Sequence, residues 1–277
     1  MRPEIDGTQT ALRLTGRDYI SCSSITTFQR CPLKYYFQYV VGLVPEFVPS
    51  SLIFGTAIHA AVESHFRALL EGACAPSVHD LMEAYQQTWK EESSSPVQFG
   101  KGESAESLTD LARRMLEAFL KSDTSRPEGE IVGIEEEFRA RIVEDCPPLL
   151  GRVDLIFCAR AALHLVDFKT ARNRWNEAKT EEGLPQMALY AELARPLATA
   201  LGCRTVRPEW IIVTKTQQPV VQAVSAQLGP SQIARTRSVV RQVWRAITTE
   251  VFYPTPSAMQ CATCPFQTAC RTWEAGP

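Results

Sequence analysis

The chain has 277 residues, of which 45% are hydrophobic and 22% are charged, values typical of a folded globular protein and not of a disordered one. Its 29 Lys and Arg residues against 31 Asp and Glu residues give a formal net charge of −2, which excludes a globally basic nucleic-acid binder but permits a local basic groove. No apolar run reaches the roughly 20 residues that span a bilayer, and residues 1–20 lack the apolar centre of a secretion signal, so we expect a cytoplasmic protein without membrane contact.

Hydrophobic periodicity divides the chain into a helical first half, a mixed middle and a final helix with a tail. The helices predicted in the first half cover residues 24–41, 55–71, 80–91 and 104–121. The strands predicted in the middle cover residues 130–143, 151–157, 163–170, 210–215 and 220–226. A helix is predicted over residues 184–201, and an amphipathic helix follows Pro230. Helices around a small group of strands predict a layered α/β architecture.

Two acidic residues and one lysine fall on neighbouring strands of the middle region. Asp154 ends the run Gly-Arg-Val-Asp, and Asp167, thirteen residues later, opens the run Asp-Phe-Lys that ends at Lys169. If residues 159–162 form a four-residue hairpin loop, Cys158 lies opposite Leu163. Directly opposed residues have Cβ atoms about 5 Å apart, and the same register then places the two carboxylates opposite each other. Two-residue alternation puts the lysine on the same face.

Two opposed carboxylates in a half-buried sheet repel each other and are costly to desolvate. A divalent cation such as Mg²⁺ removes this cost, because it binds carboxylate oxygens together with water and phosphate. Lys169 beside such a cation is suited to orienting or deprotonating a water molecule, or to neutralising charge on a phosphoryl group. The alternative is an exposed ion pair between Asp167 and Lys169, which is common for a single Asp-x-Lys but less so when Asp154 occupies the matching place.

The two runs resemble the RecB-like branch of the PD-(D/E)xK nuclease superfamily. In that family the acidic residues bind Mg²⁺ or Mn²⁺, and the lysine assists the attack of water on a phosphodiester. The resemblance implies that Asp154, Asp167 and the main-chain carbonyl of Phe168 are metal ligands and that Lys169 is the catalytic lysine.

Further motifs extend the resemblance on both sides of these strands. The segment Phe-Gly-Thr-Ala-Ile-His59 is similar to the family segment whose histidine is a metal ligand, although His59 taken alone indicates a buried, hydrogen-bonded residue. Gln186 and Tyr190 lie four residues apart, so they share one face of a helix. They resemble the family's third motif, which lies at the active site and contacts nucleic acid; taken alone, they indicate a surface glutamine and a half-buried tyrosine. We interpret residues 135–137, all glutamates, as a solvated acidic strand end, with one of them facing the metal as the alternative.

The nine cysteines point to metal binding or redox chemistry, because disulfides are rare in a reducing compartment. Cys261, Cys264 and Cys270 form a C-x2-C-x5-C cluster, and three thiolates leave a metal site one ligand short. The best fourth ligand is Cys31, in a segment that resembles the opening helix of iron–sulfur RecB-like nuclease domains. These domains include AddB-type helicase–nuclease subunits and CRISPR-associated exonucleases. The resemblance implies one 4Fe–4S cluster on these four cysteines, and structural zinc is the alternative.

The resemblance covers nearly the whole chain and implies a restriction-endonuclease-like core. Its fold would be a small central mixed sheet flanked by helices, with an N-terminal helical region and a C-terminal Cys-rich clasp. We therefore expect a single domain over residues 1–277. Within it we expect a flexible N-terminus over 1–22, core strands and a helix over 131–226, and a Cys-rich tail over 251–277 that closes onto Cys31.

The function implied is that of a metal-dependent deoxyribonuclease, with exonuclease action on single-stranded DNA or DNA ends favoured over endonuclease action. Its role would be in DNA repair, recombination or CRISPR-type DNA processing. The sequence lacks an NTPase phosphate-binding loop, so unwinding would require a helicase partner. The alternative is a nuclease-fold DNA-binding or assembly subunit that works with a helicase or integrase-like partner, with zinc in the clasp. Trp175 is a candidate for stacking on unpaired bases. The candidate phosphate-binding residues are Arg30, Lys34, Arg152, Arg172, Arg174 and Lys179.

Overall fold

A computed structural model describes residues 7–274, which fall into two compact units. The first, here called the cysteine unit, comprises, of the described residues, 7–46, 138–151 and 229–274. The second, here called the sheet unit, comprises Phe47–Glu137 and Arg152–Leu228. A single domain over residues 1–277 stays a prediction.

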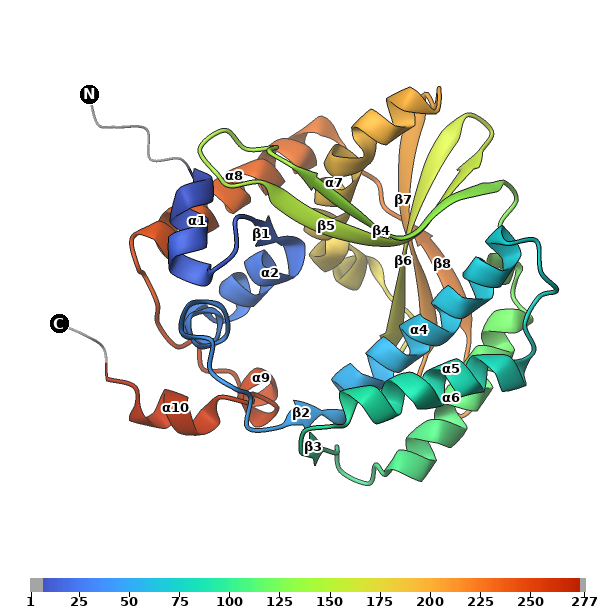
Figure 1. The fold of residues 1–277 in the computed structure, drawn as a ribbon, viewed down its shortest axis with the longest axis horizontal. Coiled ribbons are helices and arrows are strands. Elements are labelled where there is room, and N and C mark those ends of the chain that lie inside the picture. The colour runs from blue at the N-terminus through green and yellow to red at the C-terminus, as the bar shows by residue number, and fades with distance from the viewer. Residues whose placement is uncertain (1–6, 275–277) are drawn as a thin grey trace. The chain divides into compact units, whose positions relative to one another are not determined.

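A mixed β-sheet forms the centre of the sheet unit (Figure 1). β4 pairs with β5, and β6, β7 and β8 follow in that order. The β5–β6 and β7–β8 pairs are antiparallel, whereas β6 and β7 are parallel. This sheet, with helices on its faces, confirms the predicted α/β class. The strands are β4 (Glu130–Ala140), β5 (Leu149–Ala159), β6 (Ala162–Ala171), β7 (Thr205–Thr214) and β8 (Val221–Ser225).

Three helices cover one face of this sheet: α4 (Ser50–Leu70), α5 (Val78–Glu92) and α6 (Ala105–Leu120) (Figure 1). Their apolar sides enclose one buried core with alternate strand residues, such as Val166 and Phe168. The Phe66 ring of α4 stacks on the Phe168 ring, with ring centroids 5.7 Å apart. α4 begins five residues before the predicted start at residue 55 and is 21 residues long.

The parallel β6–β7 pair is joined by the long helix α7 (Glu177–Ala200), which packs on the opposite face. A Cβ at Gly183 of α7 would lie 2.7 Å from the Trp210 ring, so the absence of a side chain there permits the close packing. α7 begins seven residues earlier than predicted, because Pro185 is accommodated inside the helix. Asn176 caps its first turn through a hydrogen bond from the Lys179 N–H to Asn176 Oδ1 (3.0 Å).

The β5–β6 hairpin has the predicted register, with Cys158 opposite Leu163. Its loop is shorter than predicted, because residues 159 and 162 pair and only Arg160 and Ala161 turn the chain. Both turn residues have positive φ angles, 49° and 59°, as a two-residue type I′ turn requires. Neither is a glycine or asparagine, so the usual sequence signal for this turn is missing.

The cysteine unit is mainly helical. Residues 7–22 were expected to be flexible, but they form α1, β1 and the start of α2, while residues 1–6 lie outside the described residues. The helix predicted over residues 24–41 is interrupted at Cys31, whose extended backbone (φ −159°) ends α2 and caps α3. The elements of this unit are α1 (Gly7–Thr15), β1 (Ile20–Ser21), α2 (Cys22–Arg30), α3 (Pro32–Tyr35), the π-helix η1 (Tyr36–Val41), α8 (Pro230–Thr248), α9 (Ala258–Ala262) and α10 (Gln267–Thr272).

Three short elements complete the sheet unit: the parallel strands β2 (Val48–Pro49) and β3 (Val97–Gln98) and the 3₁₀ turn η2 (Asp123–Ser125). Across residues 7–274, no helix is both long and apolar enough to cross a membrane.

Candidate metal centre

The β5–β6 hairpin places Asp154 and Asp167 at the point where the two strands separate. The last backbone pair in the ladder is Leu155 with Val166, and the same register continued by one step pairs the two aspartates. There the Asp154 carboxylate takes over as hydrogen-bond acceptor: the Phe168 N–H donates to Asp154 Oδ2 at 2.6 Å. The ring of Phe168 is buried in the core, so only its backbone reaches the site. Its carbonyl as a metal ligand stays a prediction.

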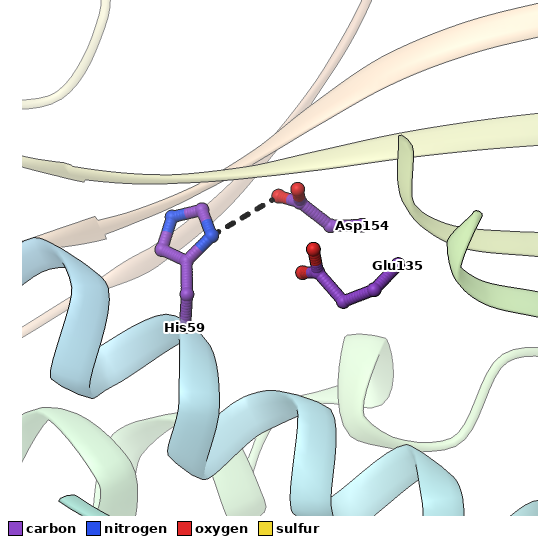
Figure 2. Close-up of side chains that lie close together, drawn as sticks. All are labelled: His59, Glu135 and Asp154. Atoms are coloured by element: carbon purple, nitrogen blue, oxygen red, sulfur yellow. Dashed lines mark ion pairs between the residues drawn. The ribbon is translucent and has the colours of Figure 1, made fainter. Parts of the chain in front are cut away.

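Three potential metal ligands from three elements converge beside this fork (Figure 2). His59 of α4, Glu135 of β4 and Asp154 of β5 each offer one ligand atom within 4.8 Å of the others. His59 Nδ1 lies 3.3 Å from Asp154 Oδ2. All three side chains are half-buried, so solvent and substrate can reach them while the surroundings hold them in place.

Glu135 agrees with the alternative interpretation of residues 135–137, in which one glutamate faces the metal position, and not with the favoured interpretation as a solvated strand end. Glu136 and Glu137 are exposed as expected, but the Glu135 side chain is 19% exposed and faces His59 and Asp154. Its backbone has a φ of 52°, a strained value for a residue other than glycine. This kink breaks the two-residue alternation, so the sequence pattern could not show which glutamate turns inward.

A second cluster surrounds Asp167, which is 3% exposed. Lys169 Nζ lies 2.5 Å from Asp167 Oδ2, and Gln186 Nε2 donates to Asp167 Oδ1 at 3.0 Å. Gln186 also donates to the Tyr190 hydroxyl at 2.7 Å, one helical turn further along α7. The predicted site residues of β6 and α7 therefore lie together: the glutamine contacts the acidic group directly, and the buried tyrosine contacts the glutamine.

Burial and mutual repulsion raise the pKa values of two carboxyl groups. Burial, with the nearby charge of Asp167, raises the pKa of Asp154 to about 8. Burial, with the charges of Asp154 and Glu63, raises the pKa of Glu135 to about 7. Arg152 compensates little, because its guanidinium pairs with Glu137 and its Nη1 lies 3.9 Å from Glu135. The charges of Lys169 and Arg152 therefore offset only part of the rise in the pKa of Asp154.

The pKa values of the two basic groups of the centre, His59 and Lys169, shift in opposite directions. Burial, with the positive charge of Lys169, lowers the pKa of His59, which keeps an imidazole nitrogen free to bind a metal. Burial alone would lower the pKa of Lys169, but the charges of Asp167 and Asp154 outweigh it and raise that pKa. Lys169 is therefore a cation at neutral pH.

This donor set fits a divalent cation. Carboxylate oxygens are the ligands that Mg²⁺ and Mn²⁺ prefer, and a neutral imidazole is a common additional ligand. A dication among His59, Glu135 and Asp154 would stabilise the ionised carboxylates. It would therefore offset the burial and the mutual repulsion that raise their pKa values.

The four cysteines predicted to share a metal line one cavity in the cysteine unit. The cavity has a volume of about 260 Å³. Its walls include Leu33, Phe37 and Phe266, which form a small apolar cluster. The Lys34 N–H points at Cys31 Sγ (3.4 Å), and the Ser257 N–H points at Cys261 Sγ (3.4 Å). The cysteines are Cys31, Cys261, Cys264 and Cys270.

Three of the four candidate phosphate-binding residues of the sheet unit follow β6 in the chain, and the fourth, Arg152, lies on β5. Arg172 and Arg174 are exposed, and Lys179 is exposed but pairs with Glu182 (2.7 Å). Trp175 is half-buried against Trp210, with ring centroids 5.2 Å apart. In the cysteine unit, Arg30 is exposed and Lys34 is half-buried.

Comparisons with known proteins agree with the fold. The family model described as PD-(D/E)XK nuclease superfamily matches residues 19–271, and the chain therefore belongs to this superfamily. The mixed sheet flanked by helices is the restriction-endonuclease-like arrangement expected of it.

A solved structure described as "Putative exonuclease" from Eubacterium rectale shares the fold at low sequence identity. It has 13% identity and a TM-score of 0.58, and the match covers 100% of this chain and 94% of that one. Another, SSO0001, has 13% identity and a TM-score of 0.36 over 90% of this chain and 94% of that one. No curated protein sequence matches the chain significantly.

Proposed function

We propose that the chain is a Mg²⁺- or Mn²⁺-dependent deoxyribonuclease whose metal is held by His59, Glu135 and Asp154, with Asp167 beside them. The observation that carries the proposal is the convergence of the first three ligand atoms within 4.8 Å, next to the Asp167–Lys169 pair. Membership of the nuclease superfamily supports it, because a divalent cation in this position is what phosphodiester hydrolysis needs.

Each side chain has a role set by its contacts. When bound, the cation would polarise a phosphodiester and lower the pKa of a water molecule. Lys169 carries its positive charge at the edge of the centre, where it can stabilise negative charge that develops on the phosphate. Gln186 holds the Asp167 carboxylate by one oxygen, which leaves the other directed at Lys169. Tyr190 in turn fixes Gln186, so α7 positions the acidic group.

The proposed substrate is single-stranded DNA or a DNA end, hydrolysed as an exonuclease. Arg172 and Arg174 follow Lys169 within five residues and are exposed, as phosphate contacts require. Gln222 holds the Trp175 backbone from both sides, accepting from its N–H (2.9 Å) and donating to its carbonyl (3.1 Å). A tryptophan fixed in this way is suited to stack on an unpaired base. The "Putative exonuclease" that shares the fold agrees with this mode of action.

In the cysteine unit we propose a 4Fe–4S cluster on Cys31, Cys261, Cys264 and Cys270. All four cysteines line one cavity of about 260 Å³, so they can share one inorganic group. Structural zinc on the same four thiolates is the alternative. A helicase or integrase-like protein is the proposed partner class, since a single-strand nuclease needs a source of unwound DNA.

A panel of end-labelled DNA substrates tests this function. Anaerobically purified protein is incubated with 5′- or 3′-labelled single strands, blunt duplexes and closed circular single strands, with Mn²⁺ or with a chelator. The proposal predicts Mn²⁺-dependent loss of nucleotides from linear single strands and no cleavage of closed circles. Cleavage of circles would replace the exonuclease with an endonuclease, and equal cleavage in chelator or by Asp167→Asn would refute the metal-dependent nuclease.

A further inference from the structure

Two cysteines outside the proposed cluster lie in contact with each other in the sheet unit. Cys158 Sγ and Cys203 Sγ are 3.5 Å apart, and both side chains are half-buried. Their number and spacing do not suit a metal site, since only two thiols meet. We propose that Cys158 and Cys203 form a peroxide-sensitive thiol pair, an oxidation site that closes to a disulfide bond. This inference stands independently of the proposed nuclease function.

Ordered backbone holds both cysteines in place. Cys158 is the last but one residue of β5 and pairs with Leu163 of β6. Cys203 follows the end of α7, where Gly202 adopts a left-handed φ of 68°. The Cys203 N–H donates to the Ala198 carbonyl (2.8 Å) and the Gly202 N–H to the Thr199 carbonyl (3.1 Å), the two bonds of a Schellman motif.

The next residue ties this helix end to the hairpin turn. The Arg204 N–H donates to the Ala161 carbonyl at 2.8 Å, directly before β7 begins at Thr205. The helix end and the hairpin that carry the two cysteines are therefore joined by backbone hydrogen bonds. The fold therefore places the two sulfur atoms 3.5 Å apart, and a movement of about 1.5 Å closes this gap to the roughly 2.05 Å of a disulfide bond.

The oxidation proceeds in two balanced steps with hydrogen peroxide as the oxidant. The Cys203 thiolate attacks one peroxide oxygen; an S–O bond forms, the O–O bond breaks, and hydroxide leaves to give a sulfenic acid. Cys158 sulfur then attacks Cys203 sulfur; the S–S bond forms, the S–O bond breaks, and the hydroxyl group leaves as water with the Cys158 proton. Two thiols lose two electrons and two protons, and one peroxide becomes two water molecules.

The environments of the two thiols support this division of roles. Burial, with the neighbouring Cys203 thiol, raises the pKa of Cys158 to about 11, so Cys158 is protonated in the resting pair and must lose its proton to the departing hydroxyl group as the S–S bond forms. Cys203 follows the exposed Leu201 at the end of α7 and is itself half-buried, so a small oxidant can reach it.

The Cys158–Cys203 disulfide bond would stabilise the sheet unit, which carries the metal centre. It would close a loop between residues 45 positions apart, which removes freedom from the unfolded chain. It would join the far end of β5, which carries Asp154, to the connection between α7 and β7. We expect the sheet unit to gain thermal stability, with a rise in melting temperature of roughly 5 °C or more.

Peptide mapping after mild oxidation tests the proposal. Reduced full-length protein is treated with a small excess of hydrogen peroxide, alkylated, digested with trypsin without reductant and analysed by mass spectrometry. The expected product is residues 153–160 joined to residues 180–204, lighter by two hydrogen atoms than the separate peptides and released by dithiothreitol. Cys74→Ser, which removes an exposed cysteine, should form the same product. Recovery of both peptides unlinked, unmodified or as separate sulfinic acids, would overturn the proposal.

Two further readouts keep the test informative if one variant folds poorly. In Cys158→Ser the sulfenic acid on Cys203 has no second thiol, so dimedone should label the 180–204 peptide after peroxide treatment. In wild-type protein the same reagent should label it much less. Equal labelling in both proteins would show that Cys158 does not resolve the sulfenic acid and would refute the pair. An unchanged melting temperature in fully cross-linked protein would refute the stabilising effect of the disulfide bond.

Discussion

Replacing Asp154 with asparagine measures how much this buried carboxyl group destabilises the folded protein when no metal is bound. The pKa of Asp154 is raised from 3.8 to about 8 by burial and by the charge of Asp167, and its side chain is 13% exposed, so solvent screens it little. At pH 7 the solution lies about 3 units above the unfolded pKa, and at 1.36 kcal/mol per unit the cost to the folded state is about 4 kcal/mol. Asparagine has no charge and keeps an oxygen that can accept the Phe168 N–H.

The sign of the pH dependence follows from the raised pKa. The contribution of Asp154 to stability is fully present below about pH 4 and is lost as the pH rises toward about 8. In chelator, Asp154→Asn should therefore equal or exceed the wild type in stability, by an amount that grows from pH 4.5 to pH 8. Mn²⁺ should stabilise the wild type strongly at pH 8 and the variant hardly at all.

Urea denaturation at several pH values, with chelator or with Mn²⁺, provides the measurement. Wild type and Asp154→Asn with the same pH slope in chelator would refute the reasoning. So would an asparagine variant that Mn²⁺ stabilises as much as it stabilises the wild type.

Three other predictions concern neighbouring groups and the cysteine cavity. Lys169→Ala should lose at least 100-fold in cleavage rate, while its Mn²⁺ affinity measured by calorimetry stays nearly unchanged. His59→Ala should instead weaken Mn²⁺ binding. Equal loss of Mn²⁺ binding in both variants would contradict these roles. Gln186→Leu should slow cleavage about 10-fold, because Asp167 loses the hydrogen bond that orients it, and a wild-type rate would exclude a positioning role. Anaerobic protein should be brown and contain iron and labile sulfide. Cys31→Ala should lose the colour and melt at a lower temperature, and Cys74→Ser should do neither; colourless protein with stoichiometric zinc would reject the cluster.

The β5–β6 hairpin shows how much of the site the sequence could predict. Alternation and the distance between Asp154 and Asp167 are sufficient to set the strand register, because a slip of one residue would turn both carboxylates to the other face. The turn itself was mispredicted, since Arg160 and Ala161 adopt left-handed backbone angles that neither residue type favours. Here strand pairing over the whole hairpin outweighs the local preference of the turn.

The inward direction of the Glu135 side chain could not be predicted from the sequence. Three successive glutamates have the same chemistry, and a regular strand would direct the first and third to one face. The φ of 52° at Glu135 breaks that rule, and such a kink is stabilised by the surrounding fold instead of by any local sequence signal. The start of α7 was missed for a similar reason, because a proline inside a long helix resembles a helix boundary in sequence.

A parallel titration of metal binding and cleavage with Glu135→Gln tests the account most directly. Glu136→Gln is the matched control, because the neighbouring glutamate is exposed and outside the ligand group. We predict that Mn²⁺ binds the wild type and Glu136→Gln, and that both degrade end-labelled single-stranded DNA as the site fills. Glu135→Gln should lose at least about 10-fold in Mn²⁺ affinity and cleave correspondingly less at the same Mn²⁺ concentration. Wild-type binding and wild-type cleavage by Glu135→Gln would contradict the proposed metal centre.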